Sequence, residues 1–316
     1  MKRLVEEGYQ VRALARRASK VGALQKLEVE IAFGDLSDES SIVAAIQGVD
    51  VVVHAAAGTS GTAEDSKTAT IQGTRNVLEA CKSSRVKKLV YISSCGVYEV
   101  AGYAEHQIVT EDAQLERFPL RRGYYSAAKL QAEALVTEAM NHYGCSIVVL
   151  RPGTLYGPGS EVYTKMIGAS LANRIFVVFG DGESKLPLIH VDNAVDAIVE
   201  SIRNSAADNQ LFNVVDDYTV TKKLYIEKVI RPLYPKSIVI YFPMSLLFAL
   251  TWLQEKVFAT LGKQPLLAVY SLVSSQKRIR YSASKIRNMI GWRSRVSFEQ
   301  AVEQLIRYGG RASDSK

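Results

Sequence analysis

Cysteine is scarce in this chain of 316 residues. The three cysteines, Cys81, Cys95 and Cys145, lie far apart in the sequence, and an odd, scattered set gives no disulfide framework. This composition suits a reducing compartment, so we expect a cytoplasmic protein. Because no histidine lies near Cys95 in the sequence to activate its thiol, we interpret this residue as a packing residue.

Long hydrophobic runs are also lacking. Four of the first seven residues are charged and no apolar run follows them, so we expect no signal peptide. The uncharged stretch 238–253 is interrupted by Pro243 and is shorter than the ~20 residues that span a bilayer. It predicts a buried strand followed by an amphipathic helix; the alternative is a helix resting on a membrane surface, with peripheral contact through residues 238–261.

Basic residues outnumber acidic ones without forming a basic patch. The 39 Lys and Arg against 32 Asp and Glu give a formal net charge of +7, but the two signs are mixed along most of the chain. The most basic stretch, 277–295, has no cluster that alternates with aromatics. We therefore expect no nucleic-acid partner; the surplus suits anionic ligands or an anionic membrane surface.

Short apolar runs alternate with helical patterns in the first half of the chain, which predicts an α/β fold with a doubly wound parallel sheet. After Tyr156 this alternation weakens and Gly and Asp turns become frequent. The sequence therefore predicts a sheet domain over 1–155 and a smaller mixed lobe over 156–316, interleaved with the last elements of the sheet. The expected strands are 11–14, 29–33, 51–55, 89–93 and 147–150, and the helical patterns between them are 41–46, 68–81 and 127–141.

Two similar pentapeptides carry a tyrosine and a lysine four residues apart, "YSAAK" at 125–129 and "YSASK" at 281–285. On a helix such a pair shares one face, so the ammonium group is expected to lower the pKa of the phenol and to let it exchange a proton with a substrate oxygen. The first copy opens a long amphipathic helix downstream of a strand that ends in serines. The second copy has no such strand before it, so we assign the chemistry to Tyr125 and a packing role to Tyr281.

A serine next to that tyrosine completes the candidate set. Ligands of open α/β sheets bind at the carboxyl ends of the strands, where Ser93 and Ser94 are expected. The hydroxyl of Ser94 can hydrogen-bond the substrate oxygen that Tyr125 protonates. The alternative is a serine that only satisfies backbone groups at the strand end.

Over residues 1–308 the chain resembles the extended short-chain dehydrogenase/reductases, the NAD(P)-dependent epimerase, dehydratase and 3β-hydroxysteroid dehydrogenase group. The resemblance is collinear over nearly the whole chain, which makes it more specific than any single motif. The matching pieces are "FGDLSD", "VDVVVHAAA", "GTRNVLEAC", "VYISSCGVY", "YSAAKLQAE", "LRPGTLYGPG", "GDG", "LIHVDNAVDAI", "FNVVDD" and "IGWRSRVSFEQAV".

The resemblance implies a Rossmann-like dinucleotide-binding domain over 1–155 and a substrate-binding lobe over 156–316. It implies catalysis by Ser94, Tyr125 and Lys129 and no metal site. Thr70 stands where family members carry Asn. The cofactor positions that it implies are Asp35 and Leu36 beside the adenine, Ala55, Ala56 and Ala57 along the pyrophosphate and ribose, and Pro152 and Gly153 beside the nicotinamide.

Family members begin with a strand and a glycine-rich turn that brings backbone N–H groups to the pyrophosphate. No such glycine pattern precedes Val11, where "KRLVEEG" resembles the end of the helix that follows this turn. We therefore expect a Rossmann-like sheet whose first strand is missing, with weak cofactor binding and low stability. A start site assigned too far downstream and a genuine fragment are both left open.

The expected cofactor is NADP(H) rather than NAD(H). NAD-selective folds place an acidic residue at the end of the second strand to hold the ribose 2′-hydroxyl, whereas arginine suits a 2′-phosphate. Here Ala15 takes the acidic position, and Arg16 and Arg17 follow it. The alternative is that both arginines are only solvated.

The substrate expected from the resemblance is a hydrophobic secondary alcohol or ketone. Sugar-nucleotide enzymes of the family usually carry Asn after "RP" and Arg after "GDG" to pair with a diphosphate, but this chain has Thr154 and Leu186. We expect residues 99–123 to form a loop over the substrate, and a homodimer is left open. The alternatives are a sugar-nucleotide epimerase or dehydratase and a non-catalytic NADP-binding protein.

Overall fold

The computed structural model describes residues 1–19, 21–58, 62–261 and 267–313. Its contacts divide the chain into two compact units that are discontinuous in sequence. The predicted division into a cofactor domain over 1–155 and a substrate lobe over 156–316 concerns function and stays a prediction, because the two compact units alternate along the chain. Unit 1 consists of Met1–Val97, Tyr124–Arg151 and Val195–Phe212, and unit 2 consists of Tyr98–Gly123, Pro152–Ala194 and Asn213–Lys316.

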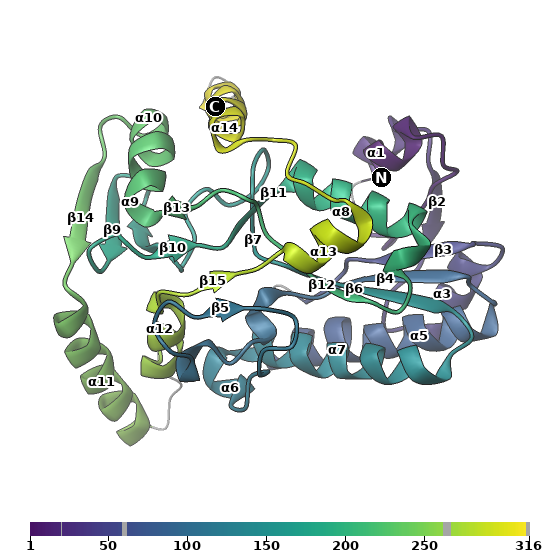
Figure 1. Cartoon of the computed structure of the whole chain (residues 1–316), viewed down its shortest axis with the longest axis horizontal. Helices are drawn as coiled ribbons and strands as arrows, with labels where there is room; N and C mark the ends of the chain where they lie inside the picture. Colours follow the sequence, from purple (N-terminus) through teal and green to yellow (C-terminus); the bar gives the residue numbers. More distant parts are fainter. Residues whose placement is uncertain (20, 59–61, 262–266, 314–316) are drawn as a thin grey trace. The chain divides into compact units, whose positions relative to one another are not determined.

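Unit 1 is built on a four-stranded sheet in the order β12-β6-β4-β3, in which β3, β4 and β6 run parallel. Runs of Val and Ile, which favour extended backbone, form these strands. Helices α3, α5 and α7 cover one face and α8 lies on the other (Figure 1). The predicted α/β fold with a parallel sheet is confirmed. The strands are β3 (Val51–His54), β4 (Lys88–Ile92), β6 (Ser146–Pro152) and β12 (Leu211–Val214), and the helices are α3 (Glu39–Ile46), α5 (Gly73–Ser83), α7 (Tyr124–His142) and α8 (Val191–Arg203).

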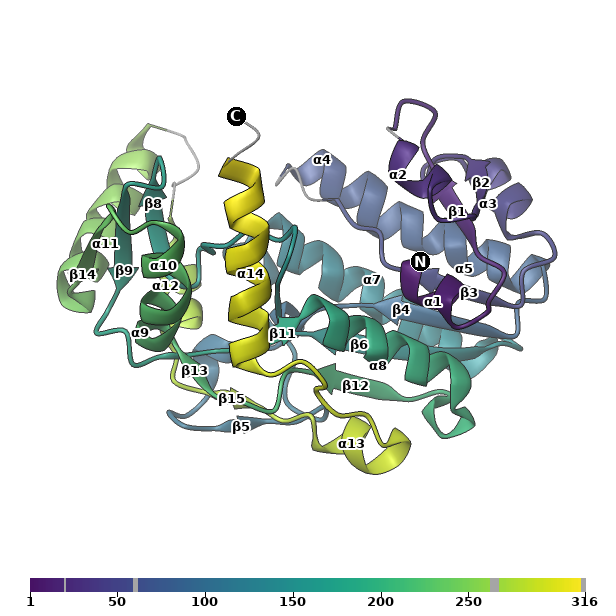
Figure 2. The same cartoon turned by 90° about the horizontal axis from the view of Figure 1, so that it is seen from above.

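A second, two-stranded sheet in unit 1 joins β1 (Arg12–Ala15) to β2 (Glu30–Phe33) in parallel. Within the described residues, β1 pairs only with β2 and β3 only with β4. The described β strands of unit 1 therefore form two separate sheets, and β1 and β3 each have one edge with no described strand on it. Figure 2 shows β1 and β2 beside the larger sheet.

Local signals fix several element ends in unit 1. Gly8, at φ +82°, ends the first helix in a backbone conformation that favours glycine. The Asp38 carboxylate accepts the backbone N–H groups of Ser40 and Ser41 at 3.1 and 3.3 Å and so caps α3. The other short elements of the unit are α1 (Lys2–Glu6), α2 (Gly22–Gln25), α4 (Ala63–Asp65), η1 (Ser66–Gln72), η2 (Cys95–Val97) and η4 (Ser205–Ala207).

The core of unit 1 lies between the larger sheet and helices α3, α5 and α7. Leu89, Tyr91 and Ile147 from the strands pack with Ile42 and Val136 from the helices. Cys81, Cys95 and Cys145 are all buried and form no disulfide, which agrees with the interpretation of Cys95 as a packing residue. This core holds the ends of β4 and α7 in place, where the candidate catalytic residues lie.

Unit 2 contains small sheets around its own core. Strand β9 pairs in parallel with β14 and antiparallel with β8, and Phe176 and Val178 from β9 pack against Tyr225, Ile226 and Leu305 from its helices. The strands of unit 2 are β5 (Ile108–Val109), β7 (Thr154–Tyr156), β8 (Gly168–Leu171), β9 (Ile175–Phe179), β10 (Lys185–Leu186), β11 (Leu188–His190), β13 (Val220–Thr221), β14 (Ile238–Phe242) and β15 (Arg280–Tyr281). Its helices are η3 (Val100–Gly102), α6 (Pro119–Arg122), α9 (Lys222–Tyr225), η5 (Ile226–Ile230), α10 (Arg231–Leu233), α11 (Met244–Thr260), α12 (Val269–Gln276), α13 (Ser284–Ile290) and α14 (Phe298–Ser313).

The uncharged stretch forms the predicted strand and helix, β14 and α11, with Pro243 between them. The prediction that the strand is buried is wrong: Ile238 and Ile240 are 59% and 45% exposed. Within the described residues, β14 is an edge strand that pairs with β9. An amphipathic helix is expected to expose polar residues, but the exposed face of α11 carries leucines such as Leu246 and Leu250. Among the described helices, none combines the length and the apolar character that a membrane span requires.

Candidate active site

The carboxyl end of β4 and the first turn of α7 form the candidate site, which lies entirely in unit 1. Strand β4 ends at Ile92, so Ser94 is the second residue after the strand. Its Oγ accepts the backbone N–H of Gly96 at 3.0 Å. Tyr125 is in the first turn of α7 and hydrogen-bonds to Ser94. The structure thus brings the predicted serine and tyrosine together.

Lys129 lies one helical turn after Tyr125 and is only 2% exposed. Its ammonium group donates to the backbone oxygen of Ile92 at 2.7 Å and lies 5.3 Å from the ring centre of Tyr91. Burial lowers the pKa of Lys129 to about 8, while the charge of Glu133 raises it. At neutral pH this side chain remains mostly protonated and keeps a positive charge beneath the site.

The pKa of Tyr125 differs from the sequence expectation. In the protein alone, partial burial raises the pKa of the phenol and the hydrogen bond with Ser94 lowers it, with a net rise. Lys129 does not produce the expected lowering, because its ammonium group is directed to the Ile92 carbonyl and the Tyr91 ring. Tyr125 therefore starts as a protonated phenol, and at 42% exposure it can be reached by a ligand.

A buried ion pair between Glu133 and Arg151 lies next to these residues. Glu133 follows Lys129 by four residues on α7 and accepts the Ser93 hydroxyl at 2.5 Å. The same carboxylate pairs with Arg151 of β6 at 2.5 Å, and the two side chains are 2% and 4% exposed. Glu133 thus ties α7 to the ends of β4 and β6. Sequence reasoning missed this pair; the four-residue spacing of Tyr125, Lys129 and Glu133 was the available signal.

His54, at the end of β3, lies deeper in the same region. Its Nε2 is 3.0 Å from the hydroxyl of Thr74. Burial and the nearby charge of Lys129 lower the pKa of His54 to about 3, so its ring is neutral at physiological pH. The positive charge of this region therefore comes from the lysine and not from the histidine.

The predicted adenine-side residues follow the ends of β1 and β2 in unit 1. Arg16 and Arg17 are both exposed, and the guanidinium of Arg17 lies 6.0 Å from the ring centre of Phe33. The carboxylate of Asp35 accepts the Ser37 N–H at 2.9 Å and hydroxyl at 2.8 Å. These bonds lower the pKa of Asp35, and the Arg16 charge lowers it further. Two cations thus border a strand end where an anion can bind.

The segment after β3 and the start of α5 contain the remaining predicted contacts in unit 1. Ala55 and Ala56 are exposed and Ala57 is half-buried. The backbone oxygen of Leu36 accepts Asn76 Nδ2 at 2.7 Å, and a Cβ at Gly73 would lie 2.9 Å from the Leu36 side chain. The segment after β2 therefore packs so closely against the start of α5 that only glycine fits at position 73.

Thr70, which stands where the family carries Asn, is buried beside these alanines. Its hydroxyl oxygen accepts the backbone N–H of Gly58 at 2.9 Å. The side chain therefore fixes the loop after β3 in this chain. This is the loop along which the resemblance places the pyrophosphate and the ribose.

Pro152 and Gly153 belong to unit 2. Gly153 donates its N–H to the backbone oxygen of Val214 at 3.0 Å. A Cβ at Gly153 would lie 2.2 Å from the backbone oxygen of Pro187. Close backbone packing therefore requires glycine here, whatever its role toward a ligand.

The second pentapeptide does not form a helical pair. Tyr281 lies in β15 and pairs with Val109 of β5, whereas Lys285 lies in α13, which begins at Ser284. The two side chains therefore do not share one helix face. This arrangement agrees with giving the chemistry to the first copy.

The comparisons with known proteins agree on one family. The family model described as "NAD dependent epimerase/dehydratase family" matches residues 1–214. An Arabidopsis thaliana 3beta-hydroxysteroid-dehydrogenase/decarboxylase isoform 1 is 25% identical over 90% of this chain and 67% of its own length. A Stigmatella aurantiaca 4-hydroxy-2-methyl-3-oxo-4-farnesyl-3,4-dihydroquinoline-1-oxide ketoreductase is 26% identical over 97% of this chain and 91% of its own length. The structure of MoeE5 in complex with UDP-glucuronic acid and NAD has a TM-score of 0.73 and 19% identity, covering 98% and 94% of the two chains.

Proposed function

Because the chain belongs to the NAD-dependent epimerase/dehydratase family, we propose that it is an NADP(H)-dependent oxidoreductase that interconverts a secondary alcohol and a ketone on a hydrophobic substrate. The observation that carries this proposal is the meeting of Ser94, Tyr125 and Lys129 at the end of β4. Their residue types supply a proton donor, a hydrogen-bond donor to the same oxygen and a fixed positive charge.

Each of the three side chains has a separate task in the proposed reaction. Bound NADP(H) supplies or accepts the hydride. Tyr125 donates its hydroxyl proton to the substrate oxygen during reduction and takes it back during oxidation. Ser94 donates a hydrogen bond to that oxygen, and the Lys129 ammonium group supplies a positive charge near the site and would hold the cofactor ribose.

The cofactor would be held mainly by residues at strand ends of unit 1. The exposed guanidinium groups of Arg16 and Arg17 suit the 2′-phosphate of NADP(H). The backbone at Asp35 and Leu36 would border the adenine, and the small side chains at 55–57 leave the backbone open to the pyrophosphate. For Pro152 and Gly153, the contact with the nicotinamide is what the family resemblance implies.

A steroid-like alcohol or ketone is the substrate class that we propose. It is supported by the two relatives, whose names give a 3beta-hydroxysteroid and a farnesyl-bearing quinoline oxide as substrates. The rival function is a sugar-nucleotide epimerase or dehydratase, favoured by the UDP-glucuronic acid in MoeE5. Leu186 argues against it, because this position is buried and apolar and offers no cation to a diphosphate. A non-catalytic NADP-binding protein is the third possibility.

We also propose that α11 contacts a membrane surface, which would bring the protein to a source of hydrophobic substrate. Exposed Leu246, Leu250 and Leu253 recur at three- and four-residue spacing on one face. Trp252 is 56% exposed, and Lys256 Nζ lies 5.8 Å from its ring centre. An apolar face bordered by an indole and an ammonium group suits the boundary between headgroups and acyl chains.

Sedimentation with anionic phosphatidylserine vesicles tests this contact. Leu250→Glu is expected to reduce the bound fraction strongly, whereas Met289→Glu, an equal change at an exposed residue of α13, is expected to leave it unchanged. Equal binding by both variants would contradict the proposed contact. A separate light-scattering measurement of the protein without vesicles gives its molar mass and so reports whether the chain forms a homodimer.

NADPH deuterated at nicotinamide C4 separates the proposed function from its rivals. The protein is incubated at a saturating cofactor concentration with 3-ketosteroids, 2-alkyl-3-oxoalkanoates or UDP-glucose, and products are analysed by mass spectrometry. We expect deuterium in an alcohol product and stoichiometric release of NADP+. In a parallel run with oxidised cofactor, epimerised UDP-glucose without net cofactor reduction would favour the epimerase. Cofactor binding without turnover of the panel would favour the non-catalytic protein.

A further inference from the structure

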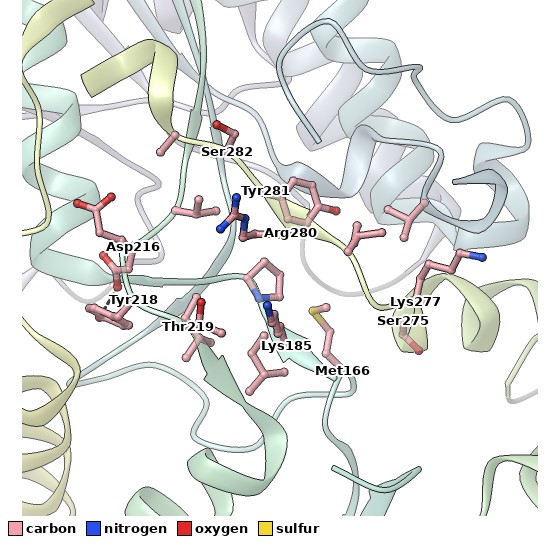
Figure 3. A pocket seen from close by; sticks show the side chains of 18 of the residues that line it. Met166, Lys185, Asp216, Tyr218, Thr219, Ser275, Lys277, Arg280, Tyr281 and Ser282 are labelled. Carbon is pink, nitrogen blue, oxygen red and sulfur yellow. Dashed lines mark hydrogen bonds between the residues drawn. The ribbon is translucent and has the colours of Figure 1, made fainter. Parts of the chain in front are cut away.

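Strand β14 has one free edge in the three-stranded sheet of unit 2. The order of that sheet is β14-β9-β8, so β9 covers one edge of β14 and no described strand pairs with the other. Figures 1 and 2 show β14 on the outer side of β9. Among the described residues that line the cavity of about 220 Å³ in Figure 3, none belongs to β14. The free edge is therefore a surface separate from that cavity.

The hydrogen bonds to β9 show which backbone groups of β14 face the free edge. The Ile238 N–H donates to the Arg174 oxygen at 2.8 Å, and the Phe242 oxygen accepts the Gly180 N–H at 2.9 Å. Because alternate residues of a strand direct their backbone groups to opposite edges, every second residue faces outward. In the described part of the chain, the outward N–H and C=O groups have no hydrogen bond. They belong to Val239 and Tyr241.

The side chains of β14 do not protect this edge against pairing. The strand has the sequence IVIYF, without a charge, a glycine or a proline, and its register with β9 is continuous. Ile238, Ile240 and Tyr241 are 59%, 45% and 38% exposed. Edge strands that stay free usually carry a charge, a proline or a bulge that blocks pairing with another chain. The composition of β14 therefore favours an edge that another strand covers.

A second copy of β14 matches this edge in antiparallel orientation. With Ile240 on a two-fold axis, Val239 lies opposite the partner's Tyr241, and Tyr241 lies opposite the partner's Val239. In an antiparallel ladder, such a hydrogen-bonded pair exchanges both of its N–H to C=O bonds. All the outward backbone groups of β14 are then paired, and the two copies present the same surface to each other, as two-fold symmetry requires.

The neighbouring symmetric registers leave bonds unmade. An axis at Val239 would place Tyr241 opposite the partner's Ser237, but the Ser237 N–H already donates to the Tyr234 oxygen at 3.0 Å. An axis at Tyr241 would place Val239 opposite the partner's Pro243, which has no N–H to donate. The axis at Ile240 is therefore the register that the backbone of this chain favours.

We propose that β14 is a homodimer interface, in which two copies pair antiparallel about Ile240 and join their three-stranded sheets into one continuous sheet. The same register brings apolar side chains together, with Ile240 opposite the partner's Ile240 and Ile238 opposite the partner's Phe242. No charged residue lies within 237–253, so no like charges oppose each other along the pair. Because it uses residues of unit 2 only, the proposal does not depend on the proposed hydride transfer.

Light scattering over a concentration series tests the interface. Ile240→Lys places two ammonium groups side by side at the axis, so we expect it to halve the molar mass of the wild-type protein. Leu171→Lys is the matched control, because Leu171 is 67% exposed on β8, at the opposite edge of the same sheet, and should keep the wild-type mass. A wild-type mass for Ile240→Lys, or an equal decrease for Leu171→Lys, would overturn the proposal.

Two further variants separate pairing from misfolding and from association through α11. An equal mixture of Ile240→Lys and Ile240→Glu should restore the wild-type mass, because opposite charges then meet at the axis; a misfolded variant would not be rescued in this way. Leu250→Glu, on α11, should keep the wild-type mass. Loss of association in Leu250→Glu with retention in Ile240→Lys would assign the contact to α11 and overturn the proposal.

Disulfide cross-linking tests the register. At the axis, the two Cα atoms of a non-hydrogen-bonded pair lie about 4.5 Å apart, which a disulfide can bridge. Under mild oxidation we expect Ile240→Cys to give a covalent dimer on a non-reducing gel, whereas Ile238→Cys, opposite the partner's Phe242, should stay monomeric. The three native cysteines are buried, so the wild-type protein gives the background. Equal cross-linking of both variants, or of neither, would refute the register.

Discussion

Glu133 offers a quantitative test of how the fold supports the candidate site. Its carboxylate accepts Arg151 Nε at 3.0 Å and Nη2 at 2.5 Å, and the Ser93 hydroxyl at 2.5 Å. Glu133→Gln keeps the shape of the side chain and removes its charge. The Arg151 guanidinium then stays buried without that carboxylate, which costs about 3–5 kcal/mol for a buried pair. We expect the free energy of unfolding to fall by this amount.

Urea denaturation followed by circular dichroism measures this loss. Glu138→Gln is the matched control, because Glu138 is an exposed glutamate on the same helix and its change should stay within about 0.5 kcal/mol. The double variant Glu133→Leu/Arg151→Met replaces the pair with apolar side chains and should recover most of the stability. If Glu133→Gln unfolds at the same urea concentration as Glu138→Gln, the ion pair does not support the strand ends.

The same variant changes the titration of the site. The charge of Glu133 raises the pKa of Lys129, which burial has lowered to about 8. Without this charge the pKa of Lys129 falls further, so the ammonium group loses its proton at a lower pH. The alkaline limb of the pH–rate profile should therefore move to lower pH in Glu133→Gln. An unshifted alkaline limb would contradict the coupling between these two residues.

Three further outcomes follow from the structure. Gly153→Ala should lower the free energy of unfolding by about 1–3 kcal/mol, because its Cβ would overlap a backbone oxygen, whereas Gly22→Ala, with open space around it, should be neutral in the same urea titration. Arg16→Ala and Arg17→Ala should each raise the Kd for NADPH roughly tenfold and leave that for NADH unchanged; equal effects on both cofactors would refute a 2′-phosphate contact. Burial lowers the pKa of Lys222 from 10.5 to about 8, so the unfolded chain binds more protons between these values and stability should rise from pH 8 to 10.5; urea midpoints should show a smaller rise in Lys222→Met.

Periodicity alone located most of the elements of unit 1. Each of the five predicted strands overlaps an observed strand, because runs such as 147–150 combine β-branched side chains with burial. The helix that begins at Tyr124 follows from its apolar spacing. The interleaving of residues 98–123 and 195–212 between the units depends on long-range contacts, which no local pattern records.

Burial and pairing were harder to predict than element type. The apolar residues of β14 suggested a core strand, but β14 lies at the edge of its sheet. The position of a strand within a sheet cannot be read from the sequence of that strand alone. The pKa of Tyr125 was expected to fall beside Lys129, yet the ammonium group points to the Ile92 carbonyl. Spacing placed the two residues on one helix face but could not say which acceptor the lysine uses.

The kinetics of Tyr125→Phe test the central claim most directly. The change removes only the hydroxyl, and Tyr124→Phe makes the same change at the exposed neighbouring residue of α7. With a substrate identified by deuterium transfer, we predict that Tyr125→Phe lowers kcat at least roughly 100-fold and leaves the Kd for NADPH unchanged, while Tyr124→Phe keeps wild-type kcat. Wild-type turnover in Tyr125→Phe would contradict the account.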